Sequence, residues 1–147
     1  MTTIDIDKNA VIEALNNILE AELAGVVRYT HYALMIFGYN RIPIVSWMRG
    51  QANESLTHAN EAGELITHLG GHPSLSIGTL LETHCHDIGD ILRESLEHET
   101  LALAEYHRLL KLVSGRNILL EEYARGKIAQ EEGHLGEVLK MLKKPGE

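Results

Sequence analysis

The chain has 147 residues, of which 44% are hydrophobic, so it can bury a core and lacks the composition of a disordered protein. Its formal net charge is −8 and lysine and arginine form no cluster, which excludes a nucleic acid as an expected partner. No uncharged apolar run approaches the roughly 18 residues of a membrane span, so we expect no membrane partner. The N-terminal segment lacks the apolar core of a signal peptide, and a single cysteine excludes an internal disulfide, so we expect a cytoplasmic protein.

Four segments show the period of amphipathic helices. Asp7 is a candidate N-cap for the first, Pro43 precedes the second, and Gly70 closes the second. The segment after Gly70 has no sustained period and is predicted to be a loop as far as the third helix. The resulting prediction is an all-α fold in one domain, residues 1–147, with helices over about residues 7–37, 44–69, 87–113 and 118–142.

The lengths of the connections predict how these helices pack. The first and third connections are short, which is typical of antiparallel helical hairpins. The second connection is long enough to run the length of helices that span roughly 40 Å. We therefore expect a four-helix bundle made of two antiparallel hairpins joined by a long crossover.

Each predicted helix carries a metal-ligating type of residue at the middle of its apolar stripe. These residues are Glu22, His58, Glu99 and Glu131, with His134 beside the last stripe. Several carboxylates buried together are very unfavourable, because each loses its hydration and repels the others. A pair of divalent cations removes both penalties, and oxygen and imidazole ligands suit iron or manganese. Residues three apart on a helix differ by about 300° in direction, so Glu131 and His134 can reach one metal pair.

Taken singly, each of these residues has a simpler interpretation. A glutamate on a helix stripe is usually a boundary residue with its carboxylate in water, and a histidine is usually a hydrogen-bonded core residue. The coincidence of such residues on four stripes is what favours a metal centre.

Several stretches resemble the bacterioferritin branch of the ferritin-like superfamily. The likeness covers nearly the whole chain and is carried by LNNILEAELAGVVRYTHY (15–32), HANEAGELITHLGG (58–71), ILRESLEHE (91–99) and EEGH (131–134). The resemblance implies a ferritin-like four-helix bundle with a di-iron carboxylate centre that oxidises Fe(II) with oxygen or peroxide for iron storage or detoxification. It makes Glu22 and Glu99 terminal carboxylates, Glu131 the bridging one, and His58 and His134 ligands of one metal each. These three glutamates are the predicted catalytic residues, and Tyr29 resembles the family's near-site tyrosine.

The chain departs from the family pattern in helix 44–69. The family motif there is E-x-x-H, but Ser55 stands three residues before His58 and the carboxylate is Glu54, four before. A four-residue step leaves Glu54 about 100° around from Ser55, so it is either a direct metal ligand or a partner of a histidine. Leu56 occupies the position of the family's haem-binding methionine, which argues against haem.

The resemblance leaves other expectations open. The chain stops soon after the fourth helix and lacks the family's short fifth helix, which helps to close a 24-subunit cage. We therefore expect a homo-oligomer, a dimer or larger, and the sequence does not predict that it stores a mineral core. Two iron ions are the expected cofactor, with manganese or zinc as alternatives. The alternative functions are a rubrerythrin-like peroxide reductase, another small di-iron oxidase, or a metal-free ferritin-like interaction protein. Ser55, which stands where the family motif has a glutamate, is the reason for the metal-free alternative.

Further histidines lie outside the central positions of the stripes. His84, Cys85 and His86 stand together in THCHD (83–87). We predict a solvated segment there with Asp87 as a helix cap, and zinc or copper binding is the alternative. His98 and His107 are predicted to lie off the stripe, without a function.

Overall fold

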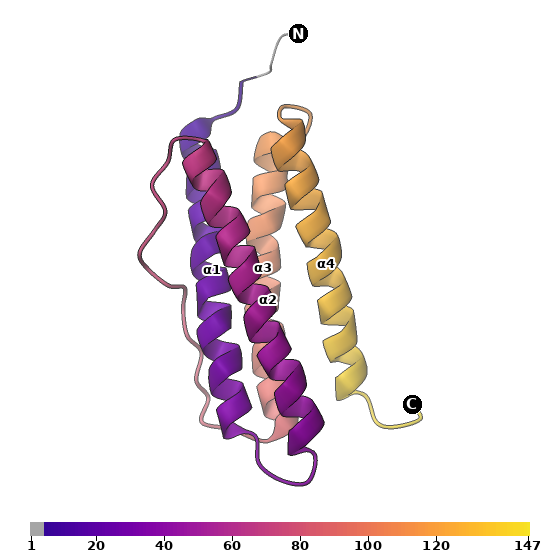
Figure 1. The fold of residues 1–147 in the computed structure, drawn as a ribbon. Helices are drawn as coiled ribbons and strands as arrows, with labels where there is room; N and C mark the ends of the chain where they lie inside the picture. Colours follow the sequence, from indigo (N-terminus) through magenta and orange to yellow (C-terminus); the bar gives the residue numbers. More distant parts are fainter. Residues whose placement is uncertain (1–4) are drawn as a thin grey trace.

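The computed structural model describes residues 5–147, and this part of the chain contains helices and loops but no strand. The four helices are α1 (Lys8–Met35), α2 (Arg41–His68), α3 (Ile88–Val113) and α4 (Ile118–Leu142). They lie side by side as two antiparallel hairpins, and the long α2–α3 connection crosses from one end of the bundle to the other (Figure 1). The predicted all-α bundle is confirmed. Residues 1–4, part of the segment expected not to be a signal peptide, lie outside the described residues.

Side-chain caps explain where three of the helices begin. The carboxylates of Asp7 and Asp87 and the side-chain oxygen of Asn117 accept backbone N–H groups at the starts of α1, α3 and α4. The first N–H groups of a helix have no partner within the helix, so these side chains supply one. The predicted caps at Asp7 and Asp87 are therefore observed.

The predicted boundary between the first two helices is wrong by a few residues. α1 ends at Met35, and α2 begins at Arg41 instead of residue 44, so Pro43 lies in its first turn. Proline is tolerated there because its missing N–H would have no helical partner. The Arg41 guanidinium donates to the carbonyl oxygens of Ala33 (3.1 Å) and Ile36 (2.5 Å), which satisfies the end of α1.

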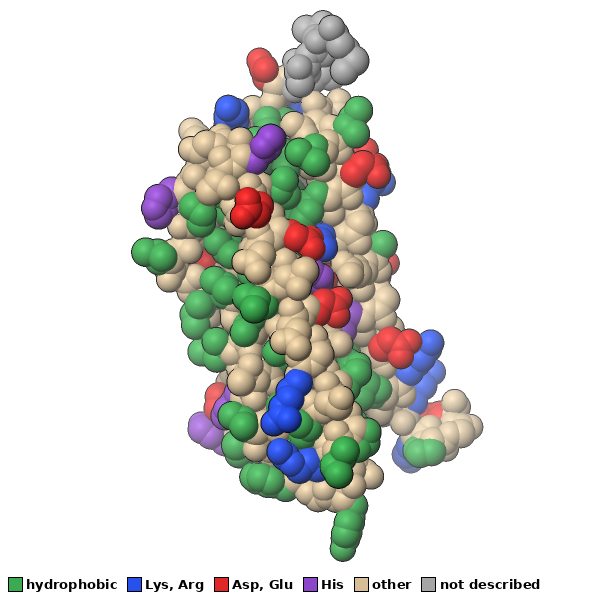
Figure 2. Space-filling model, viewed as in Figure 1, with side chains coloured by type: hydrophobic (Ala, Val, Ile, Leu, Met, Phe, Trp, Pro, Cys, Tyr) green, Lys and Arg blue, Asp and Glu red, His purple; other side chains and the backbone are tan. Residues whose placement is uncertain are grey.

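The core consists of two apolar clusters at opposite ends of the bundle. One cluster holds Leu15, Ile66 and Leu109, and the other holds Ile36 and Met48. Buried polar residues lie on the same helices between these clusters, so the bundle has a polar layer near its middle. Acidic and histidine side chains reach the surface near the middle of the face in Figure 2, with apolar side chains toward the crossover.

The crossover follows α1 through backbone contacts. The Gly78 N–H donates to the carbonyl oxygen of Glu20 (2.8 Å), and the Ser74 N–H donates to the side chain of Asn16 (2.8 Å). A Cβ at Gly78 would lie 3.1 Å from that Glu20 oxygen, so this approach favours glycine.

The end of the crossover is attached to a second buried carboxylate. Glu94 of α3 is buried and accepts hydrogen bonds from the Tyr32 hydroxyl (2.8 Å) and from the backbone (3.2 Å) and hydroxyl (2.9 Å) of Thr83. These bonds join α1, the crossover and α3. No helix within residues 5–147 is long and apolar enough to cross a bilayer.

Candidate metal centre

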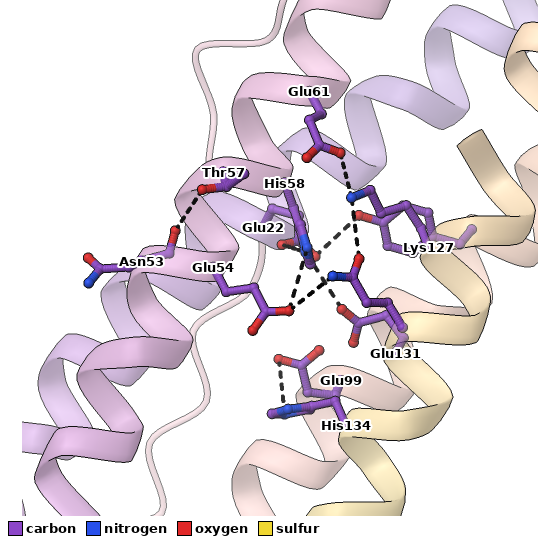
Figure 3. A network of polar contacts seen from close by, with 12 residues as sticks. Glu22, Asn53, Glu54, Thr57, His58, Glu61, Glu99, Lys127, Glu131 and His134 are labelled. Carbon is purple, nitrogen blue, oxygen red and sulfur yellow. Dashed lines mark hydrogen bonds and ion pairs between the residues drawn. The ribbon is translucent and has the colours of Figure 1, made fainter. Parts of the chain in front are cut away.

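Three of the predicted ligands meet in the polar layer. Glu22 of α1, His58 of α2 and Glu131 of α4 each offer a ligand atom, and these atoms lie within 4.8 Å of one another. Their residues are only 3%, 3% and 5% exposed. Figure 3 shows the side chains converging from separate helices. The helical spacing predicted that these residues would face inward, and the packing of the bundle brings them together.

The orientation of His58 divides its surroundings into two sides. Its Nδ1 lies 3.2 Å from Oε2 of Glu22 and 3.8 Å from Oε1 of Glu131. Its Nε2 lies 3.8 Å from Oε1 of Glu54 (Figure 3). One ring nitrogen therefore faces the buried carboxylates, and the other faces a carboxylate at the edge of the site.

Glu99 and His134 form the other half of the site. The Tyr29 hydroxyl donates to Oε1 of Glu99 (2.7 Å) and lies 3.2 Å from Nε2 of His134. That Nε2 is 4.0 Å from Oε1 of Glu99. The ring of Trp47 stacks on His134 with centroids 5.6 Å apart and planes 3° from parallel. This half is thus held by a tyrosine and a tryptophan.

The carboxyl groups have very different affinities for protons. Burial, and then the neighbouring Glu99, raise the pKa of Glu131 to about 11, and burial also raises the pKa of Glu22. Burial acts to raise the pKa of Glu99, but the neighbouring Glu131 and the charges of His134 and His98 outweigh it and lower that pKa. A proton therefore resides on Glu131, next to an ionised Glu99.

The buried carboxyl groups also affect the pKa of His58. Burial would lower the pKa of His58, but the hydrogen bond and charge of Glu22 outweigh it and raise the pKa. His58 in turn acts to lower the pKa of Glu22, against the larger effect of burial, so each group influences the proton affinity of the other.

The donor set fits small divalent cations. Oε2 of Glu131 is buried without a hydrogen-bond partner, although a carboxylate oxygen normally has one. A cavity of about 10 Å³, close to the space of one small atom, lies among these side chains. Its lining residues are Gln51, Glu54, Ser55, His58, Glu99, Glu131 and His134. Carboxylate oxygens and imidazole nitrogens around one small cavity are the ligands that iron, manganese and zinc accept.

The two residues that depart from the family motif occupy different environments. Ser55 is buried, and a Cβ added to Gly25 of α1 would lie 2.7 Å from its hydroxyl oxygen. The Glu54 side chain is 43% exposed and accepts a hydrogen bond from Gln130 (3.5 Å). The helix therefore directs a serine into the bundle where the motif has a carboxylate, and Glu54 approaches the site from the side.

The structure corrects one prediction and adds residues that the sequence analysis missed. His98 was predicted to lie off the stripe, but it is buried, and burial lowers its pKa to about 4. His98 lies three residues after Ser95 and four before Ala102, which is the spacing of the buried stripe, so the helical period could have predicted its burial. His107 is exposed, as predicted. Trp47, which stacks on His134 and packs against the apolar cluster that contains Met48, was not identified from the sequence.

The matched family model bears the description ferritin-like domain and covers residues 12–145. A ferritin-like, diiron-carboxylate protein of Bacillus anthracis strain Ames superposes with a TM-score of 0.88 at 23% identity, over 95% of this chain and 100% of that one. A dodecameric, bacterioferritin-related thioferritin of Bacteroides fragilis gives 0.82 at 22% identity, over 93% and 88%.

The bacterioferritin of Rhodobacter capsulatus, described with a metal-free dinuclear site and a haem iron, gives a TM-score of 0.83 at 23% identity, over 90% of this chain and 82% of that one. At these identities the three structures show a shared fold. No curated protein sequence matches the chain.

Proposed function

Because the chain belongs to the family of ferritin-like domains, we propose that its polar layer is a di-iron centre that oxidises Fe(II) with oxygen or peroxide, for iron storage or detoxification in the cytoplasm. The observation that carries the proposal is the meeting of Glu22, His58 and Glu131 within 4.8 Å in a buried layer. Such a group is costly without a cation and favourable with one.

The geometry supports a specific division of ligands. Glu22 and His58 would hold one iron, Glu99 and His134 the other, and Glu131 would contribute to both. Glu131 suits a shared role because one of its oxygens lies 3.8 Å from His58 and the other is without a partner. Binding requires Glu131 to release its proton, so metal uptake at neutral pH would liberate protons.

Glu54 would position His58 instead of binding a metal. It faces Nε2, whereas Nδ1 faces the two buried carboxylates. A carboxylate that accepts the outer ring N–H fixes the tautomer that leaves the inner nitrogen free to bind. One side of the pair of iron ions would then face the Ser55 hydroxyl instead of a carboxylate.

The remaining residues would control protons and access. Each bound Fe(II) would donate one electron, so two Fe(II) ions together would reduce one dioxygen to hydrogen peroxide, or one peroxide to two waters, and either reaction would consume two protons. Tyr29 would hold Glu99 through its donated hydrogen bond, and the stacked Trp47 would limit movement of His134. The acidic surface of a chain with net charge −8 would favour the approach of cations.

The direct test compares Glu131→Gln with Glu132→Gln. A glutamine in place of Glu131 would keep the shape of the side chain but could not bridge two cations, whereas Glu132 is an exposed neighbour on the same helix. Anaerobic calorimetry with Fe(II) should give two ions per chain for the wild type and the control, and a loss of at least one ion in Glu131→Gln. Oxidation on adding oxygen or peroxide should be lost in parallel.

Three results would contradict the proposal. Binding of two Fe(II) ions by Glu131→Gln would show that the metals bind elsewhere. Failure of the wild type to bind Fe(II) at all would favour the metal-free interaction protein. Iron that is turned over with peroxide but never retained would instead favour a peroxide reductase.

We also propose that the chain forms a homo-oligomer. Phe37, Tyr39 and Ile42 are 73%, 108% and 83% exposed around the α1–α2 turn, and the thioferritin of Bacteroides fragilis is a dodecamer. Large exposed apolar side chains close together are typical of association surfaces. Native mass measurement should give a multiple of the 16.4 kDa chain, and a monomer at micromolar concentration would refute this.

A further inference from the structure

A second cluster of ligand-type residues lies outside the central layer, where the end of the crossover meets α1. Nε2 of His31 on α1 lies 2.8 Å from Oε2 of Glu82. Nε2 of His86 lies 3.3 Å from Oε1 of the same carboxylate. The imidazole rings of His31 and His86 are 6.2 Å apart, so both nitrogens face one carboxylate. None of these three residues belongs to the proposed di-iron centre.

The local turn explains why these side chains converge. His84 has a left-handed backbone (φ 58°), and its N–H donates to Oε1 of Glu82 (2.6 Å). The Cys85 thiol donates to the Thr83 carbonyl oxygen (3.5 Å). The turn thus places Glu82 and His86 on the side that faces His31.

The prediction for THCHD was a solvated segment with Asp87 as a helix cap, and it is confirmed, because residues 83–85 are exposed and Asp87 caps α3. Of the three adjacent candidates, only His86 joins the cluster, and its partners Glu82 and His31 come from other positions. Cys85 is exposed and its thiol is directed to the backbone of the turn. The cluster therefore differs from the alternative set of His84, Cys85 and His86 in two of its three residues.

The chemistry of the three residues is that of a transition-metal site. One ligand atom from each of His31, Glu82 and His86 lies within 4.8 Å of the other two. Two imidazole nitrogens and one carboxylate oxygen form a common protein ligand set for zinc and leave a coordination position for water. The three residues are partly or fully exposed, so a cation could enter from solvent.

We propose that His31, Glu82 and His86 form a second metal site, which binds Zn²⁺ from solvent and ties the end of the crossover to α1. Such a tie would add to the hydrogen bonds that Glu94 makes with Thr83 in the same segment. Because the residues it joins are separated by about 50 positions in the chain, bound zinc would restrict the crossover.

The test measures bound zinc per chain by equilibrium dialysis and elemental analysis. The proteins are the wild type, His31→Ala, His86→Ala and the matched control His84→Asn, which removes a neighbouring histidine but tolerates a left-handed backbone. His31→Ala and His86→Ala should each hold one Zn²⁺ fewer than the wild type, and His84→Asn should hold the same number. Zinc should also slow proteolysis of the crossover in the wild type and the control only.

Separate variants keep this result independent of the proposed di-iron centre. In a Glu131→Gln background, which alters only that centre, adding His31→Ala should still remove one Zn²⁺. An unchanged zinc count in both His31→Ala and His86→Ala would overturn the proposal, and so would an equal loss in His84→Asn. Circular dichroism of each variant checks that the helices remain folded.

Discussion

Replacing Glu131 by glutamine should stabilise the protein after its metals are removed by chelation. The carboxyl group has an ordinary pKa of 4.5 in the unfolded chain and about 11 in the buried layer. At neutral pH, folding must therefore add a proton to a group that is ionised when unfolded. At about 1.4 kcal/mol per pH unit, this costs up to about 3 kcal/mol at pH 7. Glutamine has a similar shape and carries no charge in either state, so the cost disappears.

The sign of the pH dependence follows from the raised pKa. A group with a higher pKa in the folded state contributes its full stability below the unfolded pKa and loses it as the pH rises. The free energy of unfolding of the wild type should therefore fall relative to Glu131→Gln by up to about 1.4 kcal/mol per pH unit, between about pH 5 and about pH 8. The free energies of unfolding of the two proteins should differ least near pH 5.

Urea denaturation followed by circular dichroism measures this difference. Glu132→Gln, an exposed change of the same type, is the control and should follow the wild type at every pH. Added Fe(II), without oxygen, should reverse the order, because it stabilises proteins with the complete di-iron centre more than the variant that lacks the Glu131 carboxylate. Parallel pH profiles for the wild type and Glu131→Gln, with no difference in stability between them, would refute the reasoning about the buried carboxyl.

Three further changes test the packing around the centre. Gly25→Ala should lower the free energy of unfolding by about 1–3 kcal/mol, because the new Cβ would lie 2.7 Å from the Ser55 hydroxyl oxygen. The control Gly126→Ala, whose new Cβ would meet open space, should raise the free energy of unfolding by up to about 1 kcal/mol. Burial lowers the pKa of His98 to about 4, so the neutral, buried imidazole contributes its full stability above about pH 6.5 and loses it as the pH falls toward 4. His98→Gln should remove this part of the protein's acid sensitivity. An unchanged dependence of stability on acid pH in His98→Gln would contradict this role of His98. Tyr29→Phe should cost about 1–2 kcal/mol in thermal or urea unfolding, since it removes a hydrogen bond to a buried carboxylate; a smaller loss than in an exposed tyrosine variant would contradict this.

Helical periodicity alone predicted much of this molecule. The spacing of apolar residues predicted four helices, and the capping residues Asp7 and Asp87 predicted two of their starts. The same periodicity placed Glu22, His58 and Glu131 on inward faces, since a side chain's direction on a helix depends only on its position in the chain. These local features do not require knowledge of the neighbouring helices.

The contacts between helices were decided only by the tertiary structure. Whether Glu54 or Ser55 enters the bundle depends on the rotation of α2 against α1, where Gly25 leaves room for the serine. The stacking of Trp47 on His134 and the meeting of His31 with Glu82 join distant parts of the chain. Side-chain direction is a local property, but the neighbours a side chain meets depend on how whole helices and the crossover pack, and this packing also sets the pKa of each buried carboxyl group.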